Sequence, residues 1–146
     1  MRNLLDVNVW LTLLDDGHVH HPAVLRWWEK LHEGEAAFCR VTQMSLLRLL
    51  TNSRVMGEKV LNPAGAWRFY RKTCEDDRVV FLAEPESLEP LWESHMRDSR
   101  SSSNAWTDAY LAAFAKGHGI RLATLDEGFK HFSGLEWLLL PPEENA

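Results

Sequence analysis

The hydrophobic and polar positions along this chain form short apolar runs separated by longer segments of helical period. Apolar residues recur at intervals of three and four between the runs, which predicts helices. The short runs predict five strands, at Asn3 to Asp6, Ala36 to Cys39, Val79 to Leu82, Ile120 to Leu125 and Leu135 to Leu140. Strands that alternate with helices predict right-handed crossovers, and therefore a three-layer α/β/α sandwich with a parallel sheet of about five strands.

Capping residues, prolines and glycines predict where the helices begin and end. Pro22 begins a predicted helix that runs to about Glu33, where Gly34 ends it. Thr42 is predicted to cap a helix that runs to about Leu50. The remaining predicted helices cover Val9 to Leu14, Pro63 to about Glu75 after the cap Asn62, Glu86 to Met96, and Asn104 to about Lys116. The polar run from Asp98 to Ser103 predicts a flexible loop.

The composition predicts a single soluble domain over residues 1–146, located in the cytoplasm. Hydrophobic residues make up 45% of the 146 residues, and no run is long enough to span a membrane. Cys39 and Cys74 lie too far apart to suggest a zinc site or a disulfide scaffold. The net charge of −5 is unusual for a nucleic-acid binder, but acidic residues that hold a cation contribute to such a value.

Three aspartates stand beside apolar sequence, where an ionised carboxylate is costly unless it is paired or binds a metal. Asp6 and Asp126 each close a predicted strand, and Asp108 lies near the start of a predicted helix. If the first and fourth strands are neighbours, both strand-end carboxylates emerge at one edge, which Asp108 can join. The three predict a Mg²⁺ or Mn²⁺ site that cleaves a phosphodiester by metal-activated water.

Two polar residues are candidates to support these acids through hydrogen bonds. Asn8 follows Asp6 by two positions, and Thr124 precedes Asp126 by two. A structural interpretation also exists for each acid: Asp6 as a helix cap, Asp108 as a partner of a helix dipole, and Asp126 as the start of a turn. Three unrelated caps need not converge on one pocket, which favours the functional interpretation.

These motifs resemble the PIN-domain signature, in particular that of the VapC-type toxins of bacterial toxin–antitoxin pairs. The resemblance rests on the segments Leu5 to Val9, Thr107 to Ala113 and Leu122 to Phe129, with a further match from Arg40 to Asn52. It implies a parallel α/β/α sandwich and a Mg²⁺- or Mn²⁺-dependent endoribonuclease that cleaves RNA. It also implies a homodimer and a VapB-type antitoxin that occupies the groove near the acids.

Carried over residue by residue, the resemblance implies that Asp6, Asp108 and Asp126 are metal-site residues, with Asn8 and Thr124 in support. The family usually has a glutamate in the central helix, where this chain has Gln43, Met44 and Ser45. Gln43 or Ser45 can supply an oxygen without a charge. Glu127 can replace the acid only if its side chain turns inward, and a solvated side chain is favoured because adjacent helix residues do not share a face. Weaker metal affinity is expected unless one of them compensates.

Other polar and aromatic residues have both a functional and a structural interpretation. His18, His20 and His21 lack metal-ligand spacing and favour a solvated loop. Arg48 can contact a phosphate or pair with a carboxylate, and Arg97 and Arg100 can follow an RNA backbone from their polar segment. Trp106 can stack a base or pack in the core or a dimer contact, and packing is favoured for Trp27, Trp28 and Trp67.

Two rival functions remain open. A PIN-like module that binds RNA or an antitoxin without catalysis would account for the missing central glutamate. A receiver-like or phosphatase-like α/β domain also gathers aspartates around Mg²⁺ at strand ends. The chain has no paired acid next to Asp6 and no convincing lysine after a late strand, which argues against the second rival.

Overall fold

The sheet of this protein has five parallel strands in the order β3-β2-β1-β4-β5. The structure is a computed structural model, and it describes residues 1–97 and 104–142. The strands are β1 (Asn3–Leu5), β2 (Ala36–Phe38), β3 (Val79–Phe81), β4 (Arg121–Thr124) and β5 (Trp137–Leu139). All five predicted strands are present, and the chain reverses its direction of travel across the sheet between β3 and β4.

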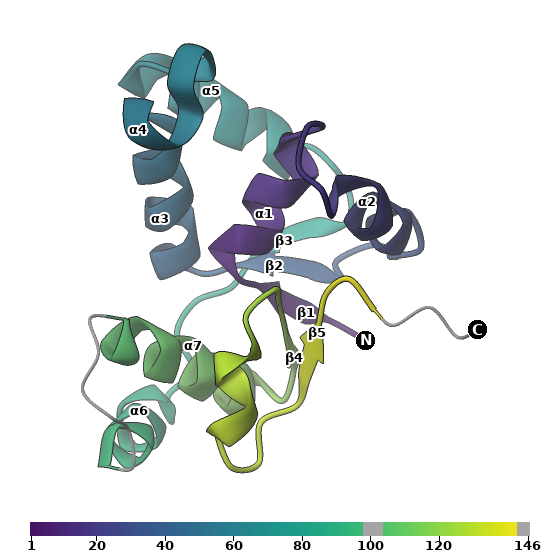
Figure 1. The fold of residues 1–146 in the computed structure, drawn as a ribbon. Coiled ribbons are helices and arrows are strands. Elements are labelled where there is room, and N and C mark those ends of the chain that lie inside the picture. The colour runs from purple at the N-terminus through teal and green to yellow at the C-terminus, as the bar shows by residue number, and fades with distance from the viewer. Residues whose placement is uncertain (98–103, 143–146) are drawn as a thin grey trace.

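Helices cover both faces of this sheet, as Figure 1 shows. The helices are α1 (Val7–Leu14), α2 (His21–Glu29), α3 (Arg40–Leu50), α4 (Ser53–Met56), α5 (Pro63–Cys74), α6 (Leu88–Arg97) and α7 (Ala105–His118), with short 3₁₀ segments η1 (Gly57–Lys59) and η2 (Glu127–His131). Helices α1, α2, α3 and α5 pack on one face, and α6, α7 and η2 on the other. The predicted three-layer α/β/α architecture is therefore confirmed.

Two hydrophobic cores fill the space between the layers because neighbouring strand residues point to opposite faces. In β1, Leu4 packs with α6 and α7, whereas Leu5 packs with α1 and α3. In β4, Leu122 and Ala123 divide in the same way. Helix α7 is buried along most of its length, and its alanines and Phe114 are almost inaccessible to solvent.

Several predicted helix boundaries are wrong, and local hydrogen bonds explain why. Helix α3 begins at Arg40 because Cys39, and not Thr42, is its N-cap. Thr42 is the third residue of the helix, and its hydroxyl accepts a hydrogen bond of 3.0 Å from the Cys39 amide. Helix α1 begins at Val7, two residues early, because Asp6 caps it. Helix α2 ends at Glu29 and not Glu33, since the amide of Lys30 already bonds three residues back, to Trp27.

The segment between α3 and α5 forms structure that the sequence pattern did not predict. Helix α4 and η1 together cover only seven residues, too few for an apolar period to be recognised. The Asn52 side chain accepts a bond from the Arg54 amide at 2.9 Å and so caps α4. Among the described helices, none is long and apolar enough to cross a membrane.

Candidate functional site

The candidate site lies where β1 and β4 end, side by side in the sheet. The two strands pair in parallel, with Leu5 opposite Ala123. Asp6 follows β1 directly, and its amide donates to the Ala123 carbonyl at 2.9 Å. Asp126 follows β4 two residues after Thr124. The expectation that the first and fourth strands are neighbours is confirmed, so both aspartates stand at one edge.

The Thr124 hydroxyl joins both strand ends through three hydrogen bonds. It donates to Asp6 Oδ2 at 2.8 Å and accepts from the Asp126 amide at 3.0 Å. It also lies 3.4 Å from the Asn8 side-chain nitrogen, which donates to it. The side-chain oxygen of Asn8, Oδ1, in turn accepts from the Leu125 amide at 3.2 Å. Thr124 and Asn8 thus connect the two segments that carry Asp6 and Asp126.

Asp6 is buried and is held at both carboxylate oxygens. Its Oδ1 accepts from the Val7 amide at 2.8 Å while Oδ2 accepts from Thr124. Burial raises the pKa of Asp6, and the nearby charge of Asp126 raises it further, whereas the bonds from Thr124 and Val7 lower it. The structural interpretation of Asp6 as a cap is correct, but a cap alone does not require a buried carboxylate next to another acid.

Asp108 stands in the first turns of α7, close enough to Asp6 and Asp126 for their charges to act on its carboxyl group. Burial raises the pKa of Asp108 to about 6, and the charges of Asp6 and Asp126 add to this effect. Among residues 1–97 and 104–142, no side chain donates a hydrogen bond to its carboxylate or forms an ion pair with it. Within the part of the chain that the structure describes, Asp108 thus experiences the like charges of Asp6 and Asp126 without a cationic partner.

Asp126 is the most exposed of the three acids. Its Oδ1 accepts from the Gly128 amide at 2.8 Å and so begins η2, as the turn interpretation predicted. Glu127 is the first residue of η2, and its side chain is exposed to solvent. In this conformation Glu127 is directed away from the protein interior, as the sequence analysis favoured.

The carboxylates are close enough to affect one another, but they do not surround a single point. Within the part of the chain that the structure describes, no three His, Cys, Asp or Glu side chains are arranged to hold one metal ion. Mg²⁺ commonly keeps several waters and uses only one or two protein carboxylates together with substrate phosphate. The oxygen-only donor set and the unrelieved repulsion around Asp108 fit such a partly hydrated cation.

The central helix α3 does not supply a further carboxylate. Gln43 is buried, and its Oε1 accepts from Arg40 Nη1 at 2.6 Å, so its oxygen is already used. Met44 is 53% exposed, and Ser45 is partly buried. The Gln43 side chain is thus hydrogen-bonded to Arg40, a cationic residue of the same helix.

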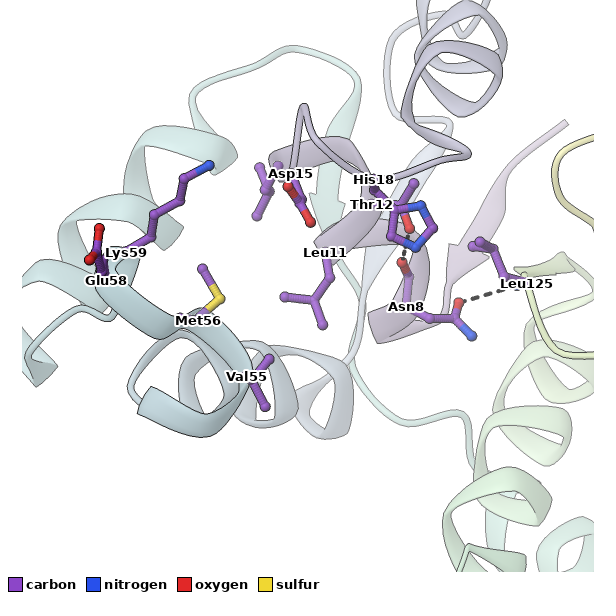
Figure 2. Close-up of a pocket in the computed structure, with 11 residues that line it drawn as sticks. Asn8, Leu11, Thr12, Asp15, His18, Val55, Met56, Glu58, Lys59 and Leu125 are labelled. Carbon is purple, nitrogen blue, oxygen red and sulfur yellow. Dashed lines mark hydrogen bonds between the residues drawn. The ribbon is translucent and has the colours of Figure 1, made fainter.

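A cavity of about 710 Å³ opens beside the acids, between α1 and the α4–η1 segment. Figure 2 shows Asn8 and Leu125 at the end nearest the site, joined by their hydrogen bond, and Val55, Met56, Glu58 and Lys59 on the opposite wall. Leu11 points into the space between the two walls (Figure 2). This cavity was not predictable from the apolar pattern of the sequence, because one wall consists of the short helical segments α4 and η1.

The other candidate residues lie away from the aspartates or make structural contacts. His21 Nδ1 lies 2.7 Å from the Thr12 carbonyl, and the His20 amide donates to His18 Nδ1 at 3.0 Å. Arg48 is exposed on α3, Arg97 pairs with Glu93 at 3.5 Å, and Arg100 lies outside the described residues.

The tryptophans divide between core and surface. Trp27 and Trp28 pack against the core beneath α1, as expected, whereas Trp67 is 43% exposed. Trp106 is 62% exposed, so it is not a core residue, and its ring meets the edge of Trp92 on α6. Because positions two apart on a helix face different directions, Trp106 and Asp108 do not share a face of α7.

Comparison with known proteins identifies the class to which this fold and site belong. The family model for the PIN domain matches residues 4–135. The chain is 43% identical to Ribonuclease VapC41 of Mycobacterium tuberculosis (strain H37Rv), over 94% of this chain and 97% of that protein. It is 33% identical to Ribonuclease VapC29 of the same organism, over 97% and 98% respectively. The chain therefore belongs to the PIN-domain family, among relatives of the VapC ribonuclease type.

Solved structures confirm the fold at lower sequence identity. VapBC-1 from nontypeable Haemophilus influenzae superimposes with a TM-score of 0.69 at 16% identity, covering 95% of this chain and 98% of that chain. Mycobacterium tuberculosis VapC20, described as a sarcin-ricin loop cleaving toxin, gives a TM-score of 0.64 at 21% identity, covering 92% and 98%. The resemblance inferred from the sequence motifs is confirmed.

Proposed function

We propose that this protein is a metal-dependent endoribonuclease toxin that cleaves RNA phosphodiesters, with Asp6, Asp108 and Asp126 as its metal-site residues. The observation that carries the proposal is the gathering of these acids at one edge of the sheet, where burial, together with the charges of Asp6 and Asp126, raises the pKa of Asp108 to about 6. Like charges gathered at the carboxyl edge of a parallel sheet are costly to stability, and perturbed acids of this kind concentrate at functional sites. The VapC ribonuclease relatives supply the reaction class.

The chain's own residues have distinct tasks in this proposal. When bound, a divalent cation makes water a stronger acid and stabilises charge on the phosphoryl oxygens. Asp6 is held in one orientation by Thr124 and Val7, so it is ready to act as a ligand without rearrangement. Asn8 keeps Leu125, and with it the start of the Asp126 segment, in place. Asp108 contributes the third negative charge from α7.

Calorimetry and cleavage together test the proposal. We expect Mn²⁺ or Mg²⁺ to bind the wild-type protein, and a structured RNA to be cut only when the chelator is absent. The Asp126→Asn variant should lose both properties, while Glu127→Gln, which changes the exposed neighbour, should retain them. Cleavage that persists in excess chelator would rule out the metal-dependent reaction.

A specific observation also favours the non-catalytic alternative, in which the protein binds RNA or its antitoxin without cutting. Gln43 occupies the helix where the family usually has an acid, and its oxygen is engaged by Arg40. Metal affinity would then rest on three carboxylates. In the Gln43→Glu and Ser45→Glu variants, Mn²⁺ affinity should increase at whichever position faces the acids. Absence of metal-stimulated cleavage by the wild-type protein would favour the alternative.

The proposed antitoxin partner has a suitable binding place in the cavity beside the acids. Several superimposable structures are VapBC complexes of toxin with antitoxin. The cavity walls combine apolar Leu11, Val55 and Met56 with charged groups at the rim, which suits an amphipathic segment. We expect Met56→Arg to weaken co-purification with the product of a small neighbouring reading frame while cleavage is retained. Unchanged co-purification would exclude the cavity.

The proposed homodimer would use the face formed by α3 and α5. Met44 and Trp67 are 53% and 43% exposed, and both line a hollow of about 360 Å³ between these helices. Large apolar side chains exposed together are typical of protein interfaces. Sedimentation should give a dimer for the wild-type protein and a monomer for Trp67→Glu. A dimer that survives this change would place the interface elsewhere.

A further inference from the structure

A further hollow lies along the same edge of the sheet as the aspartates, at the ends of β2 and β3. It has a volume of about 320 Å³ and is lined by Arg40, Phe81, Leu82, Ala83 and Glu84, which we call the Arg40 pocket. Arg40 comes two residues after the end of β2, and Phe81 is the last residue of β3. Because adjacent strands lie about 4.8 Å apart, β3 lies roughly 10 Å from β1, which carries Asp6.

Arg40 carries a positive charge at this pocket, and two uncharged groups hold its guanidinium in place. Its guanidinium carbon lies 4.8 Å from the centroid of the Phe81 ring, and Nη1 donates to Gln43 Oε1 at 2.6 Å. These two contacts orient the group without neutralising it, since both partners are uncharged. Arg40 is exposed, and no carboxylate among the described residues forms an ion pair with it.

Glu84 also lines the pocket, and its carboxylate is hydrogen-bonded to Tyr110 of α7. Glu84 Oε2 accepts a bond from the Tyr110 hydroxyl at 2.6 Å, which ties this carboxylate to α7. Glu84 is thus held by a residue of the opposite layer, although its charge lies in the same hollow. Phe81 is 42% exposed, so a large apolar side chain borders the pocket and remains in contact with solvent. The pocket therefore combines a guanidinium that forms no ion pair with a described residue and a partly exposed aromatic side chain.

We propose that the Arg40 pocket binds one nucleotide of the RNA strand whose neighbouring phosphodiester lies at the aspartates. Arg40 contacts its phosphate through the planar guanidinium, and the base packs on Phe81. This inference rests on the proposed function, and it explains how a chain with a net charge of −5 holds an anionic strand beside three acids. It also gives Gln43 a role: a glutamate there would pair with Arg40 and cancel its charge.

Equilibrium binding of a fluorescent single-stranded RNA in excess chelator tests the pocket without requiring cleavage. Each phosphate contact contributes about −0.7 to the slope of log K against log salt concentration. We expect Arg40→Gln to make this slope less negative by about 0.7, while Arg40→Lys retains it. Phe81→Leu should weaken binding roughly tenfold with the slope unchanged, and Phe81→Tyr should restore affinity.

Arg71 provides a matched control. It is also exposed and lies over an aromatic ring, 5.6 Å from the centroid of Trp67, but it stands in the last turn of α5, which leads to the opposite edge of the sheet. Arg71→Gln should leave the slope unchanged. Three outcomes would refute the proposed nucleotide site: an equal change of slope in Arg40→Gln and Arg71→Gln, an unchanged slope in Arg40→Gln, or no RNA binding by the wild-type protein.

The outcomes separate this proposal from the proposed function. RNA binding that depends on Arg40, combined with no metal-dependent cutting, would leave the pocket standing and refute the nuclease. Metal-dependent cutting by the wild-type protein, combined with an unchanged salt slope in Arg40→Gln, would support the nuclease and refute the nucleotide site. Circular dichroism and thermal melting of each variant check that the fold is intact, and Arg40→Lys shows whether a positive charge at this position suffices.

Discussion

The two edges of one sheet treat their acidic residues in opposite ways. At the edge where the strands begin, Glu35 accepts bonds from the Met1 ammonium group at 2.9 Å and from the His32 amide at 2.8 Å. These contacts, led by the His32 amide, lower the pKa of Glu35 to about 2. At the edge where the strands end, burial and neighbouring acids raise the pKa of Asp108 to about 6. The acid at the first edge is stabilised in its charged form by hydrogen bonds and a positive charge. The charged form of Asp108 at the second edge is destabilised by burial and by neighbouring negative charges.

Other groups at the two edges follow the same division. Where the strands begin, Arg121 donates to the Asn3 side chain at 2.8 Å, and Arg78 lies 3.6 Å from Asp76. Where the strands end, Asp6 is stabilised only by neutral donors, Thr124 and Val7. These groups at the first edge thus have partners of their own, while no cationic side chain in residues 1–97 and 104–142 pairs with the acids of the candidate site. Such unrelieved charge is what a bound divalent ion would compensate.

The largest expected effect is the loss of cleavage in Asp6→Asn. The amide keeps the size of the side chain but removes its charge and one cation ligand, so the rate should fall by roughly 10²-fold or more. Cleavage of a labelled RNA with Mn²⁺ measures this, and circular dichroism should show an intact fold. Glu35→Gln, at the opposite edge, serves as the control and should cut at the wild-type rate. Full activity in Asp6→Asn would remove this acid from the site.

A smaller loss is expected when the hydroxyl that joins β1 and β4 is removed. In Thr124→Val, Asp6 loses a hydrogen bond that lowers its pKa and orients its carboxylate, so its pKa should rise and its orientation should be less fixed. Groups that orient metal ligands typically contribute roughly 10- to 100-fold to affinity or activity. Mn²⁺ affinity should therefore fall within this range and recover partly as pH increases.

Thr12→Val is the matched control for this change. Thr12 is also buried, but its hydroxyl donates to the Asn8 carbonyl within α1 and does not touch a carboxylate. Both variants lose one buried hydroxyl, so a general loss of packing should affect them alike. If Thr12→Val reduced Mn²⁺ affinity as much as Thr124→Val, the special role of Thr124 would be refuted.

The same contrast shows how much of the site was predictable. The edge that holds Asp6 and Asp126 followed from short apolar runs that end in an acid, because parallel strands end on one side. Thr124 and Asn8 were predictable as supports from their spacing. The Arg40 pocket was not, because its two halves come from strands 40 residues apart whose pairing no local pattern specifies. Nor did any pattern reveal that Gln43 would bond to Arg40.

The stability of the protein without metal should increase when Asp108 loses its charge. The folded state holds the Asp108 proton more tightly than the unfolded chain does, since its pKa is raised from 3.8 to about 6. Stability therefore falls as pH increases through this interval, and the penalty is complete above pH 6. After a reduction for solvent screening of a half-exposed group, Asp108→Asn should gain about 1 kcal/mol at pH 7.

Urea unfolding in chelator between pH 4 and pH 7.5 measures this gain. The advantage of Asp108→Asn should shrink toward pH 4, where the wild-type side chain is itself protonated. Asp77→Asn, which changes an exposed aspartate at the opposite edge, should show no such gain. A variant that is less stable than wild type at pH 7 would mean that the Asp108 carboxylate already has a compensating partner.

The smallest expected effect, opposite in sign, belongs to Glu35→Gln. Because the folded-state pKa of Glu35 is lowered to about 2, its contribution is complete above the ordinary value of 4.5 and is lost as pH falls toward 2. The variant should thus unfold at lower urea than wild type at pH 7, with a difference that narrows below pH 4.5. Glu33→Gln, an exposed neighbour, should match wild type throughout. A gain in stability at pH 7 for Glu35→Gln, as expected for Asp108→Asn, would contradict the contrast between the two edges. It would mean that the charged form of Glu35 is also destabilised in the folded protein.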